Sequence, residues 1–142
     1  MTIAQLIEGR SGGIVGCAAT DTVRSAVAIL AAKRIGALPV LEGDAIVGIL
    51  SERDVVKQLA ELGPALLDSS VGSIMTTPVV SIEPGHGVMD ALGLMTERRF
   101  RHLPVVEAGR MIDFVSIGDL VKFRIERIEA EAEAMRTYIQ SA

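Results

Sequence analysis

The sequence repeats itself once, with a shift of 65 residues, and this repeat constrains the fold more than any other feature. Residues 14–57 align with residues 79–122 without a gap over 44 positions, 12 of which are identical. Identical pairs include Val23/Val88, Ala26/Ala91, Arg34/Arg99, Leu38/Leu103, Pro39/Pro104, Glu42/Glu107, Ser51/Ser116, Asp54/Asp119 and Lys57/Lys122. Most other pairs exchange one apolar residue for another. The chain therefore contains two copies of one structural unit.

Each copy predicts the element order β-α-β-β-α. A short strand is followed by a turn and by a helix whose apolar residues recur at helical spacing. Two further strands enclose a tight turn, and a second helix begins after Ser51 or Ser116. The expected strands cover residues 14–18, 38–41 and 45–50 of the first copy and 79–82, 103–106 and 111–115 of the second.

The fold class expected from this order is α+β, resembling an α/β sandwich. A sheet with one apolar face cannot bury that face alone, so the two repeats should pack together with pseudo-two-fold symmetry. We expect one module composed of a first repeat with an N-terminal helix (1–62), a linker with a short helix at 71–75 (63–77), a second repeat (78–122) and a C-terminal helical extension (123–142).

Composition narrows the class of protein. Hydrophobic residues make up 49% of the chain and aromatic residues only 3%, which predicts an aliphatic core. A net charge of −4 argues against nucleic-acid binding, which depends on neutralising phosphates. No apolar run is long enough to span a membrane. The single cysteine, Cys17, suits a reducing compartment and is interpreted as an apolar core residue, or else as a redox-sensitive thiol. We therefore expect a cytoplasmic protein.

The second half of each copy resembles the CBS domain, named after cystathionine β-synthase. It has an apolar-Pro-Val strand, a hairpin, an apolar strand and then Ser-x-x-Asp at the start of a helix, as in ALPVLEGDAIVGILSERD and RHLPVVEAGRMIDFVSIGD. The whole chain is similar to small stand-alone bacterial CBS-pair proteins. The resemblance implies a non-catalytic regulatory or signal-transduction module that binds AMP, ATP, NAD(H) or S-adenosylmethionine in two clefts. It also implies a homodimer, and the sequence contains no catalytic set and no metal site.

The two Ser-x-x-Asp turns have two interpretations. Serine before a helix, with an acid three residues later, is the capping-box pattern that satisfies free backbone amides. The same helix start can attract a phosphate, while the carboxylate accepts the hydroxyls of a ribose. With the resemblance added, we expect Asp54 and Asp119 to bind ribose and Ser51 and Ser116 to lie near phosphate.

Only the second copy carries Arg101 and His102, where the first has Gly36 and Ala37. A guanidinium can hold two phosphate oxygens, so Arg101, His102 and also Arg53 are phosphate candidates. The alternative is a solvated basic helix end, which fits Arg98 and Arg99 better. By resemblance, the candidates for the adenine pocket are Ile14, Gly16, Cys17, Ile35, Gly36, Ala37, Val80, Ile82 and Phe100, which on composition alone are ordinary core and strand residues. One position departs from the family pattern, because Gly48 of the first copy is replaced by Asp113 in the second.

The last segment predicts a long helix without glycine or proline. Its apolar residues alternate in steps of four and three, as in a coiled-coil seam: Val121, Ile125, Ile128, Ala132, Met135 and Ile139. This seam favours a homodimer contact or, alternatively, packing on its own domain, and the segment 2–7 could join the same surface. The sequence thus leaves two functions open, a nucleotide-binding regulatory module and a ligand-independent scaffold that dimerises or holds a regulated partner protein.

Overall fold

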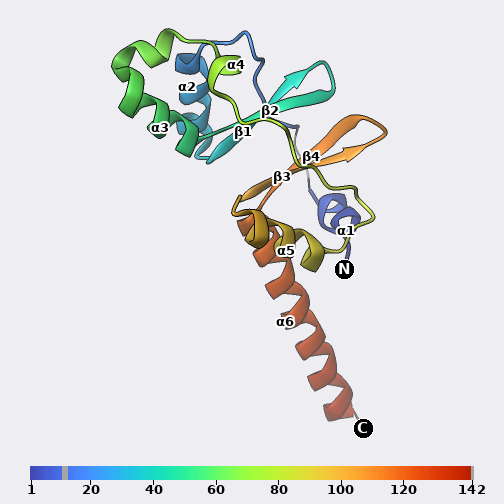
Figure 1. The fold of residues 1–142 in the computed structure, drawn as a ribbon. Coiled ribbons are helices and arrows are strands. Elements are labelled where there is room, and N and C mark those ends of the chain that lie inside the picture. Colours follow the sequence, from blue (N-terminus) through green and yellow to red (C-terminus); the bar gives the residue numbers. More distant parts are fainter. Residues whose placement is uncertain (11–12, 142) are drawn as a thin grey trace.

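The computed structural model describes residues 1–10 and 13–141. The first repeat contains α2 (Val23–Lys33), β1 (Ala37–Glu42), β2 (Ala45–Ser51) and α3 (Glu52–Leu62). The second contains α5 (Val88–Arg98), β3 (His102–Glu107), β4 (Arg110–Ser116) and α6 (Ile117–Ser141). The α+β class and the helix-hairpin-helix order of each repeat are confirmed, and each hairpin strand lies within one or two residues of its prediction (Figure 1).

The two hairpins are built alike. Each is antiparallel and closes through two residues, between Glu42 and Ala45 or between Glu107 and Arg110. Gly109 has a positive φ of 78°, a conformation that glycine adopts without a steric penalty and that two-residue hairpin turns require. Each hairpin also contains one irregularity in register, after Val40 in the first repeat and after Val105 in the second. These positions are equivalent under the 65-residue shift.

The strands predicted over 14–18 and 79–82 are much shorter than expected. Cys17 forms a single parallel bridge to Val40, and Ile82 forms the equivalent bridge to Val105. After Cys17 the chain turns at once, because the Asp21 carboxylate accepts from the Ala18 N–H at 2.9 Å and the Asp21 N–H donates to the Ala18 carbonyl at 3.0 Å. The turn leaves no room for a second pair of ladder hydrogen bonds.

The segment that precedes each repeat packs on the other repeat. The helix α1 (Ile3–Glu8) precedes the first repeat, yet Ile3 and Leu6 are buried in the core of the second. The linker forms η1 (Gly63–Asp68) and α4 (Val71–Ile74), and Val71 is buried in the core of the first repeat. Leu6 and Val71 are again related by the 65-residue shift. Both lead-in segments therefore cross to the opposite repeat in the same way, as pseudo-two-fold symmetry requires.

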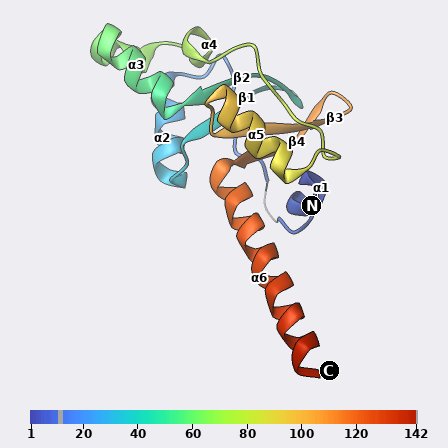
Figure 2. The same ribbon diagram turned by 60° about the horizontal axis from the view of Figure 1, so that its bottom comes forward.

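The long helix α6 projects away from the rest of the molecule (Figures 1 and 2). Its first turns belong to the core, where Leu120 is fully buried, but the side chains from Ile125 to the end of the helix are exposed. Packing of the predicted seam on its own domain is therefore not seen, and α1 joins the core of the second repeat, which includes Leu120 of α6, rather than the seam. Among the described residues, no helix combines the length and hydropathy that crossing a membrane requires.

Candidate functional site

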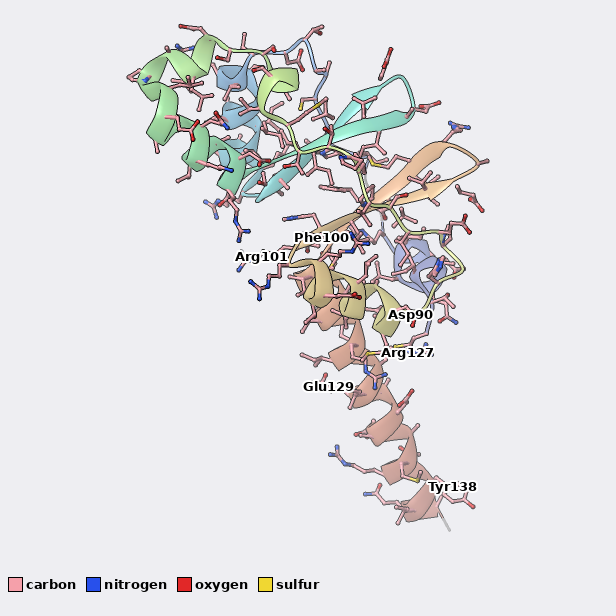
Figure 3. All side chains as sticks on the ribbon, viewed as in Figure 1. Asp90, Phe100, Arg101, Arg127, Glu129 and Tyr138 are labelled. Atoms are coloured by element: carbon pink, nitrogen blue, oxygen red, sulfur yellow. The ribbon has the colours of Figure 1, made fainter. Side chains whose placement is uncertain are left out.

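A cavity of about 740 Å³ lies between the two repeats. The start of α3 and the beginning of β1 line it from the first repeat. Thr76, residues 78–80 and the segment 98–102 line it from the linker and the second repeat. Phe100 and Arg101, labelled in Figure 3, lie where α5 gives way to β3, facing the first repeat. The volume is in the range of small-molecule sites, which commonly occupy the contact between two structural units.

Asp54 is one of two carboxylates that line this cavity, and the capping box positions it. Its Oδ2 atom accepts from the Ser51 backbone N–H at 2.9 Å, while the Asp54 N–H donates to Ser51 Oγ at 3.1 Å. The Thr76 hydroxyl donates to Asp54 Oδ1 at 3.0 Å. All these partners are neutral donors. The capping interpretation of Ser51 and Asp54 is therefore seen directly, and it fixes the carboxylate beside the cavity.

Five cationic side chains line the same cavity: Arg53, Lys57, Arg98, Arg99 and Arg101. None of them forms an ion pair with the part of the chain that the structure describes. The lining carboxylates are only Glu52 and Asp54, so the cavity has an excess of positive charge. Such a site favours an anionic ligand.

His102 also lines the cavity, and its ring stacks on Phe114 with centroids 5.5 Å apart and planes inclined by 17°. Burial lowers the pKa of His102 below its ordinary value, and the Arg101 charge acts in the same direction; the carboxylates of Asp119 and Glu52 oppose the shift. The imidazole is therefore largely neutral at pH 7. An anion bound beside it would favour the protonated form.

The Ser-x-x-Asp turn of the second repeat is placed differently. Asp119 Oδ2 accepts from the Ser116 N–H at 2.8 Å, as in the first repeat, but it also accepts from Arg10 Nη1 at 3.0 Å. Burial raises the pKa of Asp119, but the hydrogen bond from the Ser116 backbone and the charge of Arg10 outweigh it, so the net shift is downward. Asp119 and Ser116 do not line the cavity described above.

The structure thus separates the predicted site residues into two groups. The cavity brings together Ser51, Arg53, Asp54, Arg101 and His102 with the adenine candidates Gly36, Ala37, Val80 and Phe100. The other candidates lie outside its lining: Ile14, Gly16, Cys17, Ile35, Ile82, Ser116 and Asp119. Cys17 and Ile82 are buried bridge residues, which matches their ordinary interpretation as core.

Sequence reasoning missed Thr76, Lys57 and Arg10. The first two carry no motif, and only the crossing of the linker brings Thr76 to Asp54. A signal for Arg10 was available. Extending the repeat alignment four residues toward the N-terminus pairs Arg10 with Met75, and a cation opposite an apolar residue marks a difference between the two halves.

Comparison with known proteins agrees with the repeat and the fold. The sequence pattern of the CBS domain family matches residues 12–61 and 71–126. CBSX3 of Arabidopsis thaliana, a CBS domain-containing protein named as mitochondrial, is 35% identical over 134 residues. That match covers 91% of this chain and 65% of CBSX3, so the chain spans just under two thirds of this relative's length.

Solved structures of CBS-domain proteins share the fold over most of the chain. The protein ATU1752 from Agrobacterium tumefaciens is 36% identical, with a TM-score of 0.81 over 87% of this chain and 92% of that one. A CBS-domain protein from Burkholderia ambifaria is 38% identical, with a TM-score of 0.82 over 89% and 95%.

Two related structures contain ligands. CBSX2, solved in complex with AMP, is 25% identical and has a TM-score of 0.74 over 88% of this chain and 96% of that one. The CBS pair of protein MJ0100, solved with 5′-methylthioadenosine and S-adenosyl-L-methionine, is 20% identical, with a TM-score of 0.77 over 89% of this chain and 98% of that one. At this identity, the likeness shows only that the two proteins share a fold. On its repeat, its fold and these matches, the chain belongs to the CBS domain family.

Proposed function

We propose that the module binds an adenosine ligand carrying at least one phosphate group in the cavity at Asp54, and that it acts in regulation rather than as an enzyme. One observation carries the proposal: a single cavity of about 740 Å³ contains the Ser-x-x-Asp carboxylate together with five cations that have no ion-pair partner in the described residues. The AMP complex of the related CBSX2 supports this choice of ligand class.

The parts of the ligand correspond to separate parts of the cavity. Asp54 would accept the two ribose hydroxyls, since its present partners are the neutral donors Ser51 and Thr76. Arg101 and Arg53 would hold phosphate oxygens, because a guanidinium presents paired N–H donors to an oxyanion. Val80 and Phe100 would contact the adenine, with Phe100 offering a half-buried aromatic face.

The charge of the cavity distinguishes between adenosine ligands. AMP, ATP and NAD-type dinucleotides carry phosphates that five cations attract, whereas the sulfonium of S-adenosylmethionine carries a positive charge that they repel. We therefore assign the phosphate-bearing ligands to this chain, although MJ0100 was solved with S-adenosylmethionine.

The test is a binding series on protein freed of co-purified ligand. Isothermal titration would compare AMP, ATP, NAD, adenosine and S-adenosylmethionine with wild type, Arg101→Ala and the control Arg110→Ala, which removes a cation at a hairpin tip instead. We expect the phosphate ligands to bind, adenosine to bind about tenfold more weakly than AMP, and only Arg101→Ala to reduce that difference. Absence of binding at millimolar concentration, or S-adenosylmethionine binding more tightly than AMP, would overturn the proposal.

We propose in addition that α6 pairs with α6 of a second copy in parallel. The seam residues Ile125, Ile128 and Met135 are 48–59% exposed on a helix that projects away from the body (Figure 1). In a parallel pair with this seam, Arg124 of one helix faces Glu129 of the other, and Glu131 faces Arg136. Both contacts join opposite charges.

An antiparallel pair would instead bring Glu129 opposite Glu129 and Lys122 opposite Arg136, which repel each other. Sedimentation of Ile128→Glu should show a monomer if the seam holds the dimer, whereas Thr137→Glu, outside the seam, should leave the dimer intact. Oxidation of Ile139→Cys, at the last seam position, should cross-link two parallel helices near their ends, because only a parallel pair places this position opposite itself. A dimer that survives Ile128→Glu, or an uncross-linked Ile139→Cys dimer, would refute this arrangement.

A further inference from the structure

The second Ser-x-x-Asp carboxylate is held by a cation from the far end of the chain. Arg10 Nη1 lies 3.0 Å from Asp119 Oδ2, and Arg10 Nε lies 3.4 Å from Asp113 Oδ2. One guanidinium therefore bridges two carboxylates that come from α6 and β4. Arg10 and Asp119 are about two-fifths exposed, but the Asp113 side chain is only 17% exposed, so the bridge is anchored at a protected end.

Among the described residues, no cation pairs with Asp54 in this way. Asp54 receives hydrogen bonds from the Ser51 N–H, the Ser51 hydroxyl and the Thr76 hydroxyl, all of them neutral. A ribose hydroxyl can exchange with a neutral hydroxyl at little cost, because one hydrogen bond of similar strength replaces another. Displacing a guanidinium costs more, since charge-assisted hydrogen bonds are roughly twice as strong as neutral ones. The two Ser-x-x-Asp carboxylates therefore differ in how available they are to a ligand.

The repeat shows that the difference belongs to a specific pair of positions. Under the 65-residue shift, Arg10 corresponds to Met75 and Asp113 corresponds to Gly48. Met75 packs against Gly48, and a Cβ at position 48 would lie 2.8 Å from Met75 Cγ, so only glycine admits this apolar contact. In the other half the same contact is an Arg10–Asp113 ion pair. The guanidinium is thus placed by Asp113 beside Asp119, where the first half has a thioether.

We infer that Arg10 determines which cleft takes the ligand: by occupying the Asp119 carboxylate, it confines ribose binding to the cleft at Asp54. This inference rests on the proposed function and deepens it, since it sets the stoichiometry at one ligand per chain.

The experiment is a titration of AMP by isothermal calorimetry against wild type, Arg10→Ala and Arg10→Ala/Asp54→Ala. The matched control is Arg24→Ala, which removes an exposed arginine paired with Asp68 at 3.3 Å, away from both carboxylates. We expect one AMP bound per chain in wild type and in the control, and a second, more weakly bound AMP in Arg10→Ala. The double variant should retain that second AMP alone. Arg10→Lys keeps a charge but not the two-sided fork, so it should open the second cleft only partly.

One bound AMP per chain in Arg10→Ala, or two bound AMP per chain in wild type, would overturn the inference and leave the proposed function standing. Absence of AMP binding by every variant would overturn the proposed function and this inference with it. A ligand-free measurement stands beside the titration: by carboxyl NMR, the pKa of Asp119 should rise when Arg10 is replaced, because the Arg10 charge helps to lower it. An unchanged pKa of Asp119 would show that the bridge does not act on this carboxylate.

Discussion

Replacing each Ser-x-x-Asp carboxylate by alanine separates capping from binding, because the two residues have the same structural role. Asp54 and Asp119 each accept the backbone N–H of the preceding cap serine, at 2.9 Å and 2.8 Å. Each also has one further contact, from the Thr76 hydroxyl or from Arg10. Losing a cap costs about 1 kcal/mol of the free energy of unfolding. For a chain of 142 residues this lowers the melting temperature by about 3 °C, and by a similar amount in both variants.

Their effects on ligand binding should differ widely. At Asp54, two ribose hydroxyls would donate to a charged carboxylate, and each such hydrogen bond contributes about 1.5 kcal/mol. Asp54→Ala should therefore weaken AMP binding by about 3 kcal/mol, which is roughly a hundredfold in Kd. Asp119→Ala should change Kd at the first cleft by less than about threefold, since Asp119 does not line that cavity.

The assay is isothermal titration with AMP, alongside thermal melts of the same protein samples without ligand. Equal losses of affinity in both variants would refute the unequal clefts, and a loss confined to Asp119→Ala would place the ligand in the other cleft. An Asp54→Ala variant that melts about 3 °C lower yet binds AMP normally would show that Ser51-x-x-Asp54 is only a helix cap.

Three further predictions concern single residues. Burial lowers the pKa of His102 below 6.5, so the contribution of this residue to the free energy of unfolding is present above pH 6.5 and is lost as the pH falls below it. Binding of a phosphate should raise this pKa. Calorimetry in buffers of different ionisation heat should therefore detect proton uptake near pH 6.5, and His102→Gln should abolish it. Burial, assisted by the Asp21 charge, raises the pKa of Cys17 to about 11, so the thiol should resist iodoacetamide at pH 8 until the chain is unfolded; rapid labelling of the folded protein would contradict this. Gly48→Ala should lower the free energy of unfolding by about 1–3 kcal/mol in urea denaturation, because its Cβ meets Met75; an unchanged midpoint would show that Met75 moves aside without cost.

Most of the fold followed from local patterns in the sequence. Apolar spacing located α2 and α5, and alternation around short polar turns located both hairpins to within two residues. The strands before α2 and α5 were overestimated, because the sequence shows that Cys17 and Ile82 are apolar but not that the chain turns after one bridge. The position of α1 could not be predicted either. Its apolar face, with Ile3 and Leu6, fits any apolar surface, and only the three-dimensional arrangement selects the second repeat.

The sequence groups the candidate binding residues differently from the structure, and the crossing of the connections explains why. An alignment of two copies assigns Arg101 and His102 to the second copy together with Asp119, since all three lie within 79–122. In the folded chain, Arg101 and His102 line the cavity of Asp54, because this cavity is enclosed by parts of both repeats. The residues of one cleft are therefore separated in sequence by a repeat boundary.

The same crossing allows the two halves of the chain to be read as an internal comparison. Equivalent positions of the two lead-in segments contact equivalent positions of the opposite repeats, as Met75 on Gly48 and as Arg10 on Asp113. Exchanging one member alone would leave either an aspartate against a thioether or a guanidinium above a glycine, and each would lack its partner in a partly buried place. Arg10 is therefore compatible with Asp113, and Met75 with Gly48, but neither residue of a pair is compatible with a member of the other pair. Because the Arg10–Asp113 pair also reaches Asp119, Arg10→Ala is expected to change ligand stoichiometry rather than stability alone.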